Sequence, residues 1–448
     1  MFGKKGDAER RRITRREFLG VSGRLALSLP LAGLIGCSPK LGENSFGALA
    51  IPAFTGSDEQ ILDELEQTAF RYFWEQAYPT TGLIKDRTHA RDTDSYFGAS
   101  IAAVGFGLTA LCIGDSRGYM QTKPIRERVR TTLTTLLHRA EGHEGFYYHF
   151  IHWLTGKRIW HSELSSVDTA ILICGVLTAR QYFREDQPIV DLATQIYNNV
   201  NWEWMLNEGA TLSMGWTPED GFIPERWSHY SELMMMYLLG MGSPTHPLSP
   251  DTWSSWVRPK HTYQGITYIS SGDPVFTHQY SHGWFDFRNQ HDDFADYFQN
   301  SVNATLAHKL FCLSLQGRFP DYSVDLWGFT ASDSINGYVV WGGPPPTGPI
   351  DGSISPCAAA GSLPFLYDDC MRVLRNIRAY HPKAWSRYGF TDSFNPLKNW
   401  YNADVIGIDL GISMLMTENH RTGFAWNYFM QNPEARNAMQ LAGFQPNP

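Results

Sequence analysis

The chain has few cysteines, and their spacing matches neither a metal site nor a disulfide framework. Six occur in 448 residues, with no Cys-x-x-Cys pair and no cysteine–histidine pattern of a zinc site. Five lie beyond residue 37, an odd number, and several stand in apolar runs: Cys112, Cys174, Cys312, Cys357 and Cys370. We expect buried free thiols, although an oxidising compartment would permit a disulfide.

The sequence also lacks the motifs of several common enzyme classes. It has no glycine-rich phosphate loop, no GxSxG turn for a serine nucleophile and no HExxH zinc helix. The formal net charge is −8 and no basic stripe is present, which argues against nucleic acid as a partner. We therefore expect no metal, no cofactor and no nucleic acid, and we expect a monomer.

The first 36 residues have the pattern of an export signal and should not be interpreted as part of a fold. A basic lead precedes Arg15-Arg16, and Phe18-Leu19 and a weakly apolar run follow. This run is too short and too rich in Gly and Ser for a spanning helix. Leu34-Ile35-Gly36-Cys37 resembles a lipobox, and Ser38 favours the outer membrane. We predict twin-arginine export, lipidation of Cys37 and a periplasmic protein anchored to the outer membrane; an ordinary signal with a chance cysteine is the alternative.

Residues 37–56 are expected to form a tether, and residues 57–448 one mainly helical domain. Ser57 precedes two acids, which is typical of a helix start, and apolar residues follow at helical spacing. No Pro/Ser-rich linker or charge run divides this part. Clear strand patterns are few, the best being 146–151 and 265–269. Further helices are expected near residues 97–113, 122–139, 166–184, 187–205, 228–240, 294–316, 362–379 and 409–430.

Helices joined by alternately short and long loops predict an all-α fold of the α/α toroid type. In that architecture an inner and an outer ring of helices leave a cleft at one end, which the longer loops build. An α-solenoid is the alternative, but the sequence has no fixed repeat period.

Aromatic side chains are abundant, at 14% of residues with 15 Trp, and one stretch combines them with an acid. Between residues 215 and 247, Glu232 enters an apolar run in the company of Trp216, Tyr230 and His246. An acid in apolar surroundings holds its proton more tightly. A protonated carboxyl beside aromatic faces suits the cleavage of a sugar chain. A buried structural glutamate, satisfied by neighbouring hydroxyls and amides, explains this segment equally well.

Two further places concentrate polar groups. Glu163 and Asp168 stand where a loop enters an apolar helix, and one of Ser165, Ser166 and Asp168 could simply cap that helix. Trp284, Asp286 and Arg288 suggest a hydrogen-bonded substrate wall or, nearly as well, a structural Asp–Arg network. The His and Asp residues around them match neither a zinc helix nor an EF-hand loop, so a metal site is not expected.

Asp409 is an acid at an apolar, glycine-flanked helix entry. It could cap that helix. It could equally be the second carboxylate of a hydrolase, ionised and directed at a water molecule.

Several motifs in a fixed order make the chain resemble one known family. In chain order they are GWTPEDG, YSExMMxYxLxxGSPTHP, HxWxDFR, DYFxNS, GxxASD, DGxIxPxAAxGSLPF, YGFxDxFN, GIDxG and ENxRTGxxW. The chain thereby resembles the bacterial glycoamylase-like domain, which includes glycoside hydrolase family 144, from about Ile61 to Phe444. The resemblance implies an (α/α)6 barrel over residues 57–448 and a β-1,2-glucanase. It allows endo-acting enzymes, exo-acting enzymes that release sophorose, and related domains that remodel chains by transglycosylation.

The same resemblance implies roles for three acids. The family's SE-before-DTA, YSE and ID(Q)G motifs fall on Glu163, Glu232 and Asp409. The resemblance makes Glu232 the general acid and Asp409 the general base of an inverting hydrolysis. Glu163 would then support the substrate or the water, and Asp168 would have a supporting or structural place.

The chain departs from the common family pattern at two positions. Leu410 stands where members often carry Gln, and His152 stands where an acid is frequent before the TG turn. Both departures bear on which substrate and product lengths we expect. An endo-acting β-glucan hydrolase is our first expectation. A polysaccharide lyase that acts on a uronate through Tyr or His, and a glycan-binding lipoprotein without catalysis, are the rival classes.

Overall fold

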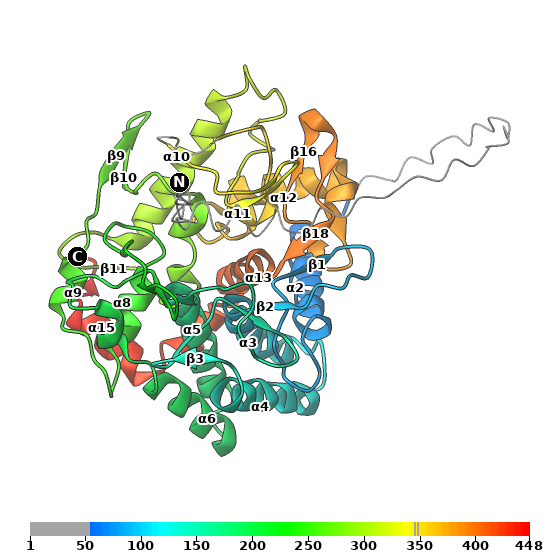
Figure 1. Ribbon diagram of the computed structural model, residues 1–448. Helices are drawn as coiled ribbons and strands as arrows, with labels where there is room; N and C mark the ends of the chain where they lie inside the picture. Colours follow the sequence, from blue (N-terminus) through cyan, green and yellow to red (C-terminus); the bar gives the residue numbers. More distant parts are fainter. Residues whose placement is uncertain (1–53, 345, 347–348) are drawn as a thin grey trace, which may run out of the picture.

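The computed structural model describes residues 54–344, 346 and 349–448. The predicted export signal, Cys37 and residues 37–53 of the tether lie outside these residues. The chain is mainly helical, as predicted, and its strands are short (Figure 1). The α-helices are α2 (Asp58–Glu75), α3 (Ile101–Ser116), α4 (Thr122–His138), α5 (Ser166–Tyr182), α6 (Gln187–Asn198), α7 (Trp202–Leu206), α8 (Met234–Met241), α9 (Asp251–Ser254), α10 (Tyr297–Ser314), α11 (Pro356–Ala360), α12 (Tyr367–Tyr380), α13 (Gly407–Thr422), α14 (Phe424–Phe429) and α15 (Pro433–Leu441).

Four short 3-10 helices and a set of antiparallel strands connect them. The 3-10 helices are η1 (Val275–His278), η2 (Ser281–Gly283), η3 (Pro382–Ala384) and η4 (Pro396–Lys398). The paired strands are β1 (Arg87–His89) with β18 (Asp404–Ile406), β2 (Gly98–Ser100) with β5 (Phe150–His152), β3 (Gly142–His143) with β4 (Phe146–Tyr147), β6 (Leu164–Ser165) with β7 (Gly215–Thr217) and β8 (Gly221–Phe222), β9 (Lys260–Tyr263) with β10 (Ile266–Ile269), β11 (Gln290–His291) with β19 (Gln445–Pro446), β12 (Ser332–Ser334) with β13 (Gly337–Val339), β14 (Trp385–Ser386) with β15 (Gly389–Phe390), and β16 (Phe394–Asn395) with β17 (Trp400–Tyr401).

The helix boundaries follow local chemistry. Ser57 caps α2 by accepting a hydrogen bond from the Gln60 amide, as its position predicts. The helix expected over 409–430 is divided at Gly423, whose φ of 70° is the left-handed conformation that ends α13. The run expected over 362–379 is α12 with a separate short α11 before it. The run expected from 228 becomes helical only at Met234.

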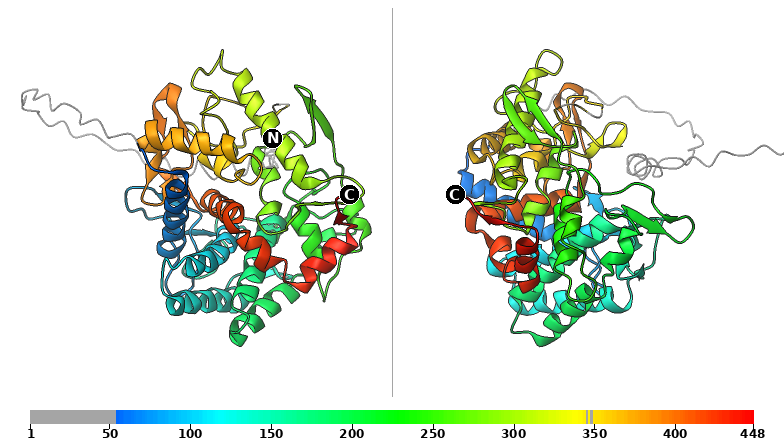
Figure 2. Two further views of the ribbon diagram at one scale, coloured as in Figure 1. Left: turned by 180° about the vertical axis from the view of Figure 1, so that it is seen from behind. Right: turned by 90° about the vertical axis from the view of Figure 1, so that its left-hand side faces the viewer.

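The helices form two layers. Almost every residue of α3 and α5 is buried, and these two helices pack directly on each other. Their backbones meet at Gly105 and Gly175, where a Cβ on Gly175 would lie 2.0 Å from the Gly105 carbonyl oxygen. In contrast, α4, α6 and α12 bury one face only. In Figures 1 and 2, α3 and α13 accordingly lie inside, and α4 and α6 lie at the periphery.

The strands bring the first turns of the inner helices to one end of the molecule. β2, β6 and β18 lead directly into α3, α5 and α13. β1 pairs with β18 and is bridged to β2 through Lys85 and Ala99. The hairpin that pairs with β2 is bridged to β6 through Tyr148 and Leu164. Side chains from the starts of these helices therefore gather at the same end.

The core contains the thiols that the sequence predicted. Each of the five described cysteines is free and buried. No helix within residues 54–344, 346 and 349–448 has the length and apolar character needed to cross a membrane.

Candidate active site

Glu232 lies directly before α8, and only 2% of its surface is exposed. Its backbone carbonyl accepts a hydrogen bond of 2.9 Å from Ser281 Oγ. The same hydroxyl accepts a hydrogen bond of 3.2 Å from the Met235 amide. The start of α8 is thereby tied to η2, which fixes the backbone that carries Glu232.

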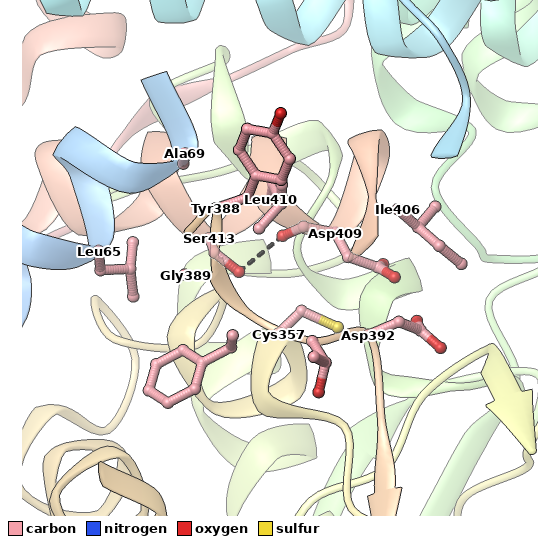
Figure 3. A pocket seen from close by; sticks show the side chains of 12 residues that line it. Leu65, Ala69, Cys357, Tyr388, Gly389, Asp392, Ile406, Asp409, Leu410 and Ser413 are labelled. Atoms are coloured by element: carbon pink, nitrogen blue, oxygen red, sulfur yellow. Dashed lines mark hydrogen bonds between the residues drawn. The ribbon is translucent and has the colours of Figure 1, made fainter. Parts of the chain in front are cut away.

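Asp409 lies in the first turn of α13 and is 7% exposed. Burial raises the pKa of its carboxyl, hydrogen bonds with Asp392 and Cys357 lower it, and the result is a pKa raised to about 6. Figure 3 shows Asp409, Asp392 and Cys357 close together, brought from three separate segments. Together with Leu410 and Ser413 they line a small cavity of about 20 Å³, large enough for one water molecule.

Asp392 and Asp409 form a carboxyl pair. Burial raises the pKa of Asp392 well above its ordinary value, and the charge of Asp409 raises it further. Among the described residues, Asp392 Oδ1 and Asp409 Oδ2 have no N–H or O–H donor in range. Two carboxyl groups can share a hydrogen bond only if one of them carries a proton. The pair therefore holds one proton on Asp392, and Asp409 is the member that ionises first.

A half-buried arginine, Arg87, pairs with two further acids next to this pair. Arg87, on β1, lies 2.9 Å from Asp333 Oδ2 through Nη1 and 3.1 Å from Asp86 Oδ2 through Nε. The Asn402 amide donates hydrogen bonds to Asp333 Oδ2 at 2.9 Å and to Asp392 Oδ2 at 3.0 Å. One cation and one amide thus connect the acids around Asp409.

Glu163 and Asp168 share a histidine. His149 Nδ1 lies 3.0 Å from Glu163 Oε1, and His149 Nε2 lies 3.7 Å from Asp168 Oδ2. Burial opposes a charge on His149, but the attraction of Asp168 and Glu163 outweighs it and raises the pKa of His149 to about 9. Asp168 also accepts a hydrogen bond from Ser165 Oγ, and Ser165 caps α5 in its place. The capping role considered for Asp168 thus belongs to Ser165.

The same three residues could in principle bind a metal ion. One donor atom from each of His149, Glu163 and Asp168 lies within 4.8 Å of the others. A metal requires a neutral imidazole nitrogen, whereas the raised pKa keeps His149 protonated through neutral pH. The arrangement is better described as an imidazolium held between two carboxylates.

Electrostatic effects connect the three parts of the site. Burial raises the pKa of Tyr280 well above its ordinary value, and the charges of Asp409 and Glu232 add to the effect. Tyr280 therefore lies within range of both acids. Asp86 likewise raises the pKa of both His149 and Asp409. Three parts accordingly gather at one end of the inner helices: Glu232, Asp409, and the group of Glu163, His149 and Asp168. We call these five residues together the acid cluster.

Two aromatic residues predicted to contact substrate lie in the core instead. Trp284 has no exposed surface, and its Nε1 donates a hydrogen bond of 3.0 Å to Thr109 Oγ1. Tyr230 is 1% exposed and its hydroxyl lies 3.1 Å from His278 Nδ1. Their burial gives the predicted substrate contacts no support, because a composition rich in aromatics does not distinguish core from surface.

Three other predicted residues lie at the far end of the helices. His246 follows the C-terminal end of α8, whereas Glu232 precedes its N-terminal end. Asp286 and Arg288 pair with each other at 2.8 Å, and the Arg288 guanidinium lies 4.0 Å above the ring of Trp426, on α14. α14 follows the C-terminal end of α13, so the pair is separated from Asp409 by the length of that helix. The structural Asp–Arg network, considered alongside the substrate wall, is the correct interpretation.

Trp216 lies on β7, the strand next to Glu163, but its side chain faces away from Glu163. Its strand, β7, pairs with β6 and so runs beside Glu163. The neighbouring Gly215 faces Glu163, whose Cγ would lie 3.1 Å from a Cβ at that position. Successive strand residues face opposite sides, and the Trp216 ring accordingly stacks on His143 at 5.1 Å. Trp216 is thus turned away from the acid cluster.

The sequence did not single out several residues that complete the site. Asp333 and Asp392 lie inside the GxxASD and YGFxDxFN motifs, which could have identified them. Arg87, His149 and Cys357 had no such signal, because their importance depends on contacts between segments far apart in the chain.

Comparisons with known proteins relate the chain to enzymes that cleave sugar chains. Residues 224–433 match the model of the Glycoamylase family, described as "Putative glucoamylase". An exo beta-1,2-glucooligosaccharide sophorohydrolase (non-reducing end) from Parabacteroides distasonis is 29% identical over 436 residues, which covers 89% of this chain. The chain spans 60% of the length of that relative.

Solved structures show the same overall fold. The endo-beta-1,2-glucanase of Chitinophaga pinensis, in complex with sophorotriose and glucose, is 28% identical with a TM-score of 0.80, over 87% of this chain and 99% of that one. The beta-1,2-glucanase of Parabacteroides distasonis is 28% identical with a TM-score of 0.81, over 87% of this chain and 60% of that one. The match of residues 224–433 to this family model, together with these similarities, bears out the family resemblance that the motifs predicted.

Proposed function

We propose that this protein is a glycoside hydrolase that cleaves β-1,2-glucan by inverting general acid/base catalysis. The observation that carries the proposal is the placement of two buried acids, Glu232 and Asp409, around Tyr280 at the starts of two inner helices. The names of its relatives supply the substrate class, because they act on β-1,2-glucan or its oligosaccharides.

The roles follow from the surroundings of each acid. Glu232 is held in a fixed, buried position and protonates the departing glycosidic oxygen. Asp409 ionises ahead of Asp392 and takes the proton of the attacking water, directly or through a substrate hydroxyl. Glu163, paired with the His149 cation, accepts hydrogen bonds from sugar hydroxyls or orients the water. Asp168 holds the other side of His149 and has a supporting role.

Replacement of Glu232 by Gln tests the assignment of the general acid. The amide preserves the shape of the side chain but cannot act as an acid. Turnover should therefore fall by about two to four powers of ten, which is the usual contribution of a general acid to the rate. Binding should persist, because the hydrogen-bonding atoms remain. The measurements are the release of reducing ends from linear β-1,2-glucan and a binding titration. Near-normal turnover by Glu232→Gln would refute the assignment.

We propose endo action as the mode of cleavage. The Chitinophaga pinensis relative, which this chain matches over 99% of its length, is an endo-enzyme. Exo action that releases sophorose is the second candidate, because the curated relative acts in that way. Product sizes over time distinguish the two: a mixed early ladder indicates endo cleavage, and one small product from the start indicates exo cleavage.

The arrangement of helices supports an (α/α)6 barrel. Inner α3, α5, α8, α11 and α13 alternate along the chain with the outer helices α2, α4, α6, α10 and α12. The η1–η2 segment takes the remaining inner position, preceded by the loop that carries α9. This alternation gives six outer–inner pairs.

We also propose that the protein is exported by the twin-arginine route and anchored through Cys37. The support is the sequence of residues 14–37. Replacing Arg15-Arg16 by lysines should retain the protein in the cytoplasm, and Cys37→Ser should release it from the membrane fraction. Unchanged fractionation of both variants would contradict the proposal.

A further inference from the structure

An aromatic platform lies on the surface beside the acid cluster. It consists of Phe97, Trp160 and His152. Phe97 is 40% exposed and Trp160 is 43% exposed. Phe97 stacks on the His152 ring at 5.2 Å and meets the Trp160 ring at 5.7 Å. Exposed aromatic rings that adjoin one another, in contrast to single scattered ones, indicate a surface that binds a partner.

The backbone of this region is built to hold Trp160 in place. Trp160 and His161 have φ angles of 55° and 53°, a left-handed conformation that residues other than Gly rarely adopt. The Trp160 ring lies over Gly98, where a Cβ would approach its Cη2 to 2.5 Å. Such strain persists only where the surroundings impose it, and it is frequent at functional sites.

Arg158 provides that support. Its guanidinium donates hydrogen bonds to the His161 carbonyl at 2.8 Å and the Ser162 carbonyl at 2.6 Å. It also pairs with Glu219 through two contacts of 2.7 and 2.9 Å and lies 4.7 Å above the ring of Tyr148. The turn that presents Trp160 is therefore fixed from below by one side chain.

The platform is connected to the acid cluster on two sides. Tyr96, whose ring lies 5.7 Å from Trp160, directs its hydroxyl to Asp86 Oδ2 at 3.5 Å. On the other side Phe150 lies 5.4 Å from Trp160 and stacks on His149 at 4.0 Å. A sugar chain that reaches the acid cluster along this surface would thus pass over Trp160 and Phe97.

We propose that Trp160, with Phe97 beside it, is a binding subsite on which a glucose ring of β-1,2-glucan stacks outside the cleaved bond. The proposal deepens the proposed function and rests on it. The C–H faces of a glucose ring are apolar and match an exposed indole in size, while the hydroxyl edge remains free for polar partners. His152 contributes a third ring to the platform through its contact with Phe97.

Kinetics of platform variants on linear β-1,2-glucan test the subsite. Trp160→Ala should raise KM about 3- to 10-fold, the effect of losing one ring-stacking contact, and leave kcat within about two-fold because no reacting atom is touched. Trp160→Tyr should keep most of the affinity, and Phe97→Ala should raise KM independently. Phe294→Ala is the matched control: Phe294 is 44% exposed and follows β11 in the chain, and β11 lies on the side of the molecule away from β2 (Figure 1). Thermal unfolding confirms that each variant is folded.

The outcomes separate the subsite from the hydrolase. If the wild type cleaves the glucan and Trp160→Ala and Phe97→Ala both behave like Phe294→Ala, the subsite is refuted and the hydrolase stands. If the wild type binds the glucan without new reducing ends, and Trp160→Ala weakens that binding, the subsite stands and hydrolysis is refuted. If the wild type neither binds nor cleaves the glucan, both are refuted.

Discussion

At the scale of single residues, Asp409 determines the expected pH dependence. Its pKa, raised to about 6 mainly by burial, is that of the group which must be ionised to accept a proton from water. We predict that kcat/KM rises with pH through about 6 and falls roughly tenfold per unit below that value. A pH profile of kcat/KM, which reports the free enzyme, measures this limb. A limb near pH 4 would contradict the assignment of Asp409 as the base.

Two substitutions of Asp392 test what sets the acidic limb of the kcat/KM profile. The hydrogen bond with Asp392 lowers the pKa of Asp409. Asp392→Ala removes the donor, so the limb should move to higher pH. Asp392→Asn keeps an N–H donor at the same place, so the limb should stay closer to that of the wild type. Equal limbs in both variants would show that the carboxyl pair has no influence on the base.

The sequence identified some residues of the site and missed others for a physical reason. Glu232 and Asp409 were recognisable as candidates because an acid in an apolar run is unusual, but their roles were implied only by the family resemblance. His149 could not be predicted from the residues alone, because its contact with Glu163 depends on the fold. Asp392 lies in a motif that could have identified it, but its effect on Asp409 likewise depends on contacts across the fold. The local sequence could not show that Trp284 lies in the core, because a core tryptophan and a sugar-binding one have the same local sequence character.

At the scale of elements, Arg421 joins α13 to α2 at the end opposite the acid cluster. Its guanidinium lies 2.8 Å from Glu66, which has no exposed surface, and 2.6 Å from Asp63. Arg421→Met would leave Glu66 buried without this partner, which costs about 3 kcal/mol once Glu66 is ionised. We predict a lower midpoint of thermal unfolding, with kcat little changed at temperatures where the variant is folded.

The loss in Arg421→Met should depend on pH. Burial and the charge of Glu418 raise the pKa of Glu66 to about 8, above its ordinary value of 4.5, so the folded state binds this proton more tightly than the unfolded state. Arg421 lowers the pKa of Glu66, so its removal raises that pKa further. Below about pH 8 Glu66 keeps its proton in both folded proteins, and the loss of stability should be small there; it should grow as pH rises above about 8. Adding Glu66→Gln removes the buried charge and should restore most of the stability. A pH-independent loss that Glu66→Gln does not repair would contradict this account.

Elements with strong local signals were predictable, and those that depend on neighbours were not. The start of α2 at Ser57 and the extent of α4 follow from capping and periodicity. The late start of α8 does not, because residues before Met234 are held instead by a bridge between His229 and Val257. The short strands between helices are similarly fixed by pairing with distant segments, which a reading of local sequence does not reveal.

At the scale of the whole molecule, the predicted alternation of short and long loops explains where the site lies. The long connections precede the inner helices and carry β1, β2, β6 and β18, whose pairings hold the first turns of those helices together. Helix starts also present unpaired amide groups and a positive dipole end, which favour anionic side chains such as Asp409. The fold thus places acids from distant parts of the sequence at one end, and the opposite end holds the ion pairs that join the helices.

The C-terminal segment, residues 444–448, packs against the part of the molecule that carries α8. Phe444 lies 5.7 Å from Trp253 and 5.9 Å from Tyr297, and Tyr297 stacks on Tyr230 two residues before Glu232. β19 pairs with β11, and the Asn447 amide side chain donates a hydrogen bond of 2.8 Å to Asp296. Ending the chain at Gly443 removes both sets of contacts, so we predict a loss of about 2–3 kcal/mol in unfolding free energy, less than for a fully buried Phe.

Two shorter changes assign that loss to its cause. Phe444→Ala alone should reproduce most of it, because ring packing outweighs a two-residue strand pair at the surface. Removal of residues 447 and 448 alone should have a small effect. Denaturant unfolding of the three variants measures the differences, and the pH limb of kcat/KM serves as the readout of the site. Asp409 lies on α13, and its partners Asp392 and Cys357 come from two other segments, so the groups that set its pKa are outside the C-terminal segment. The limb should therefore stay near pH 6 in all three variants; a displaced limb would show that the C-terminal segment is coupled to the base.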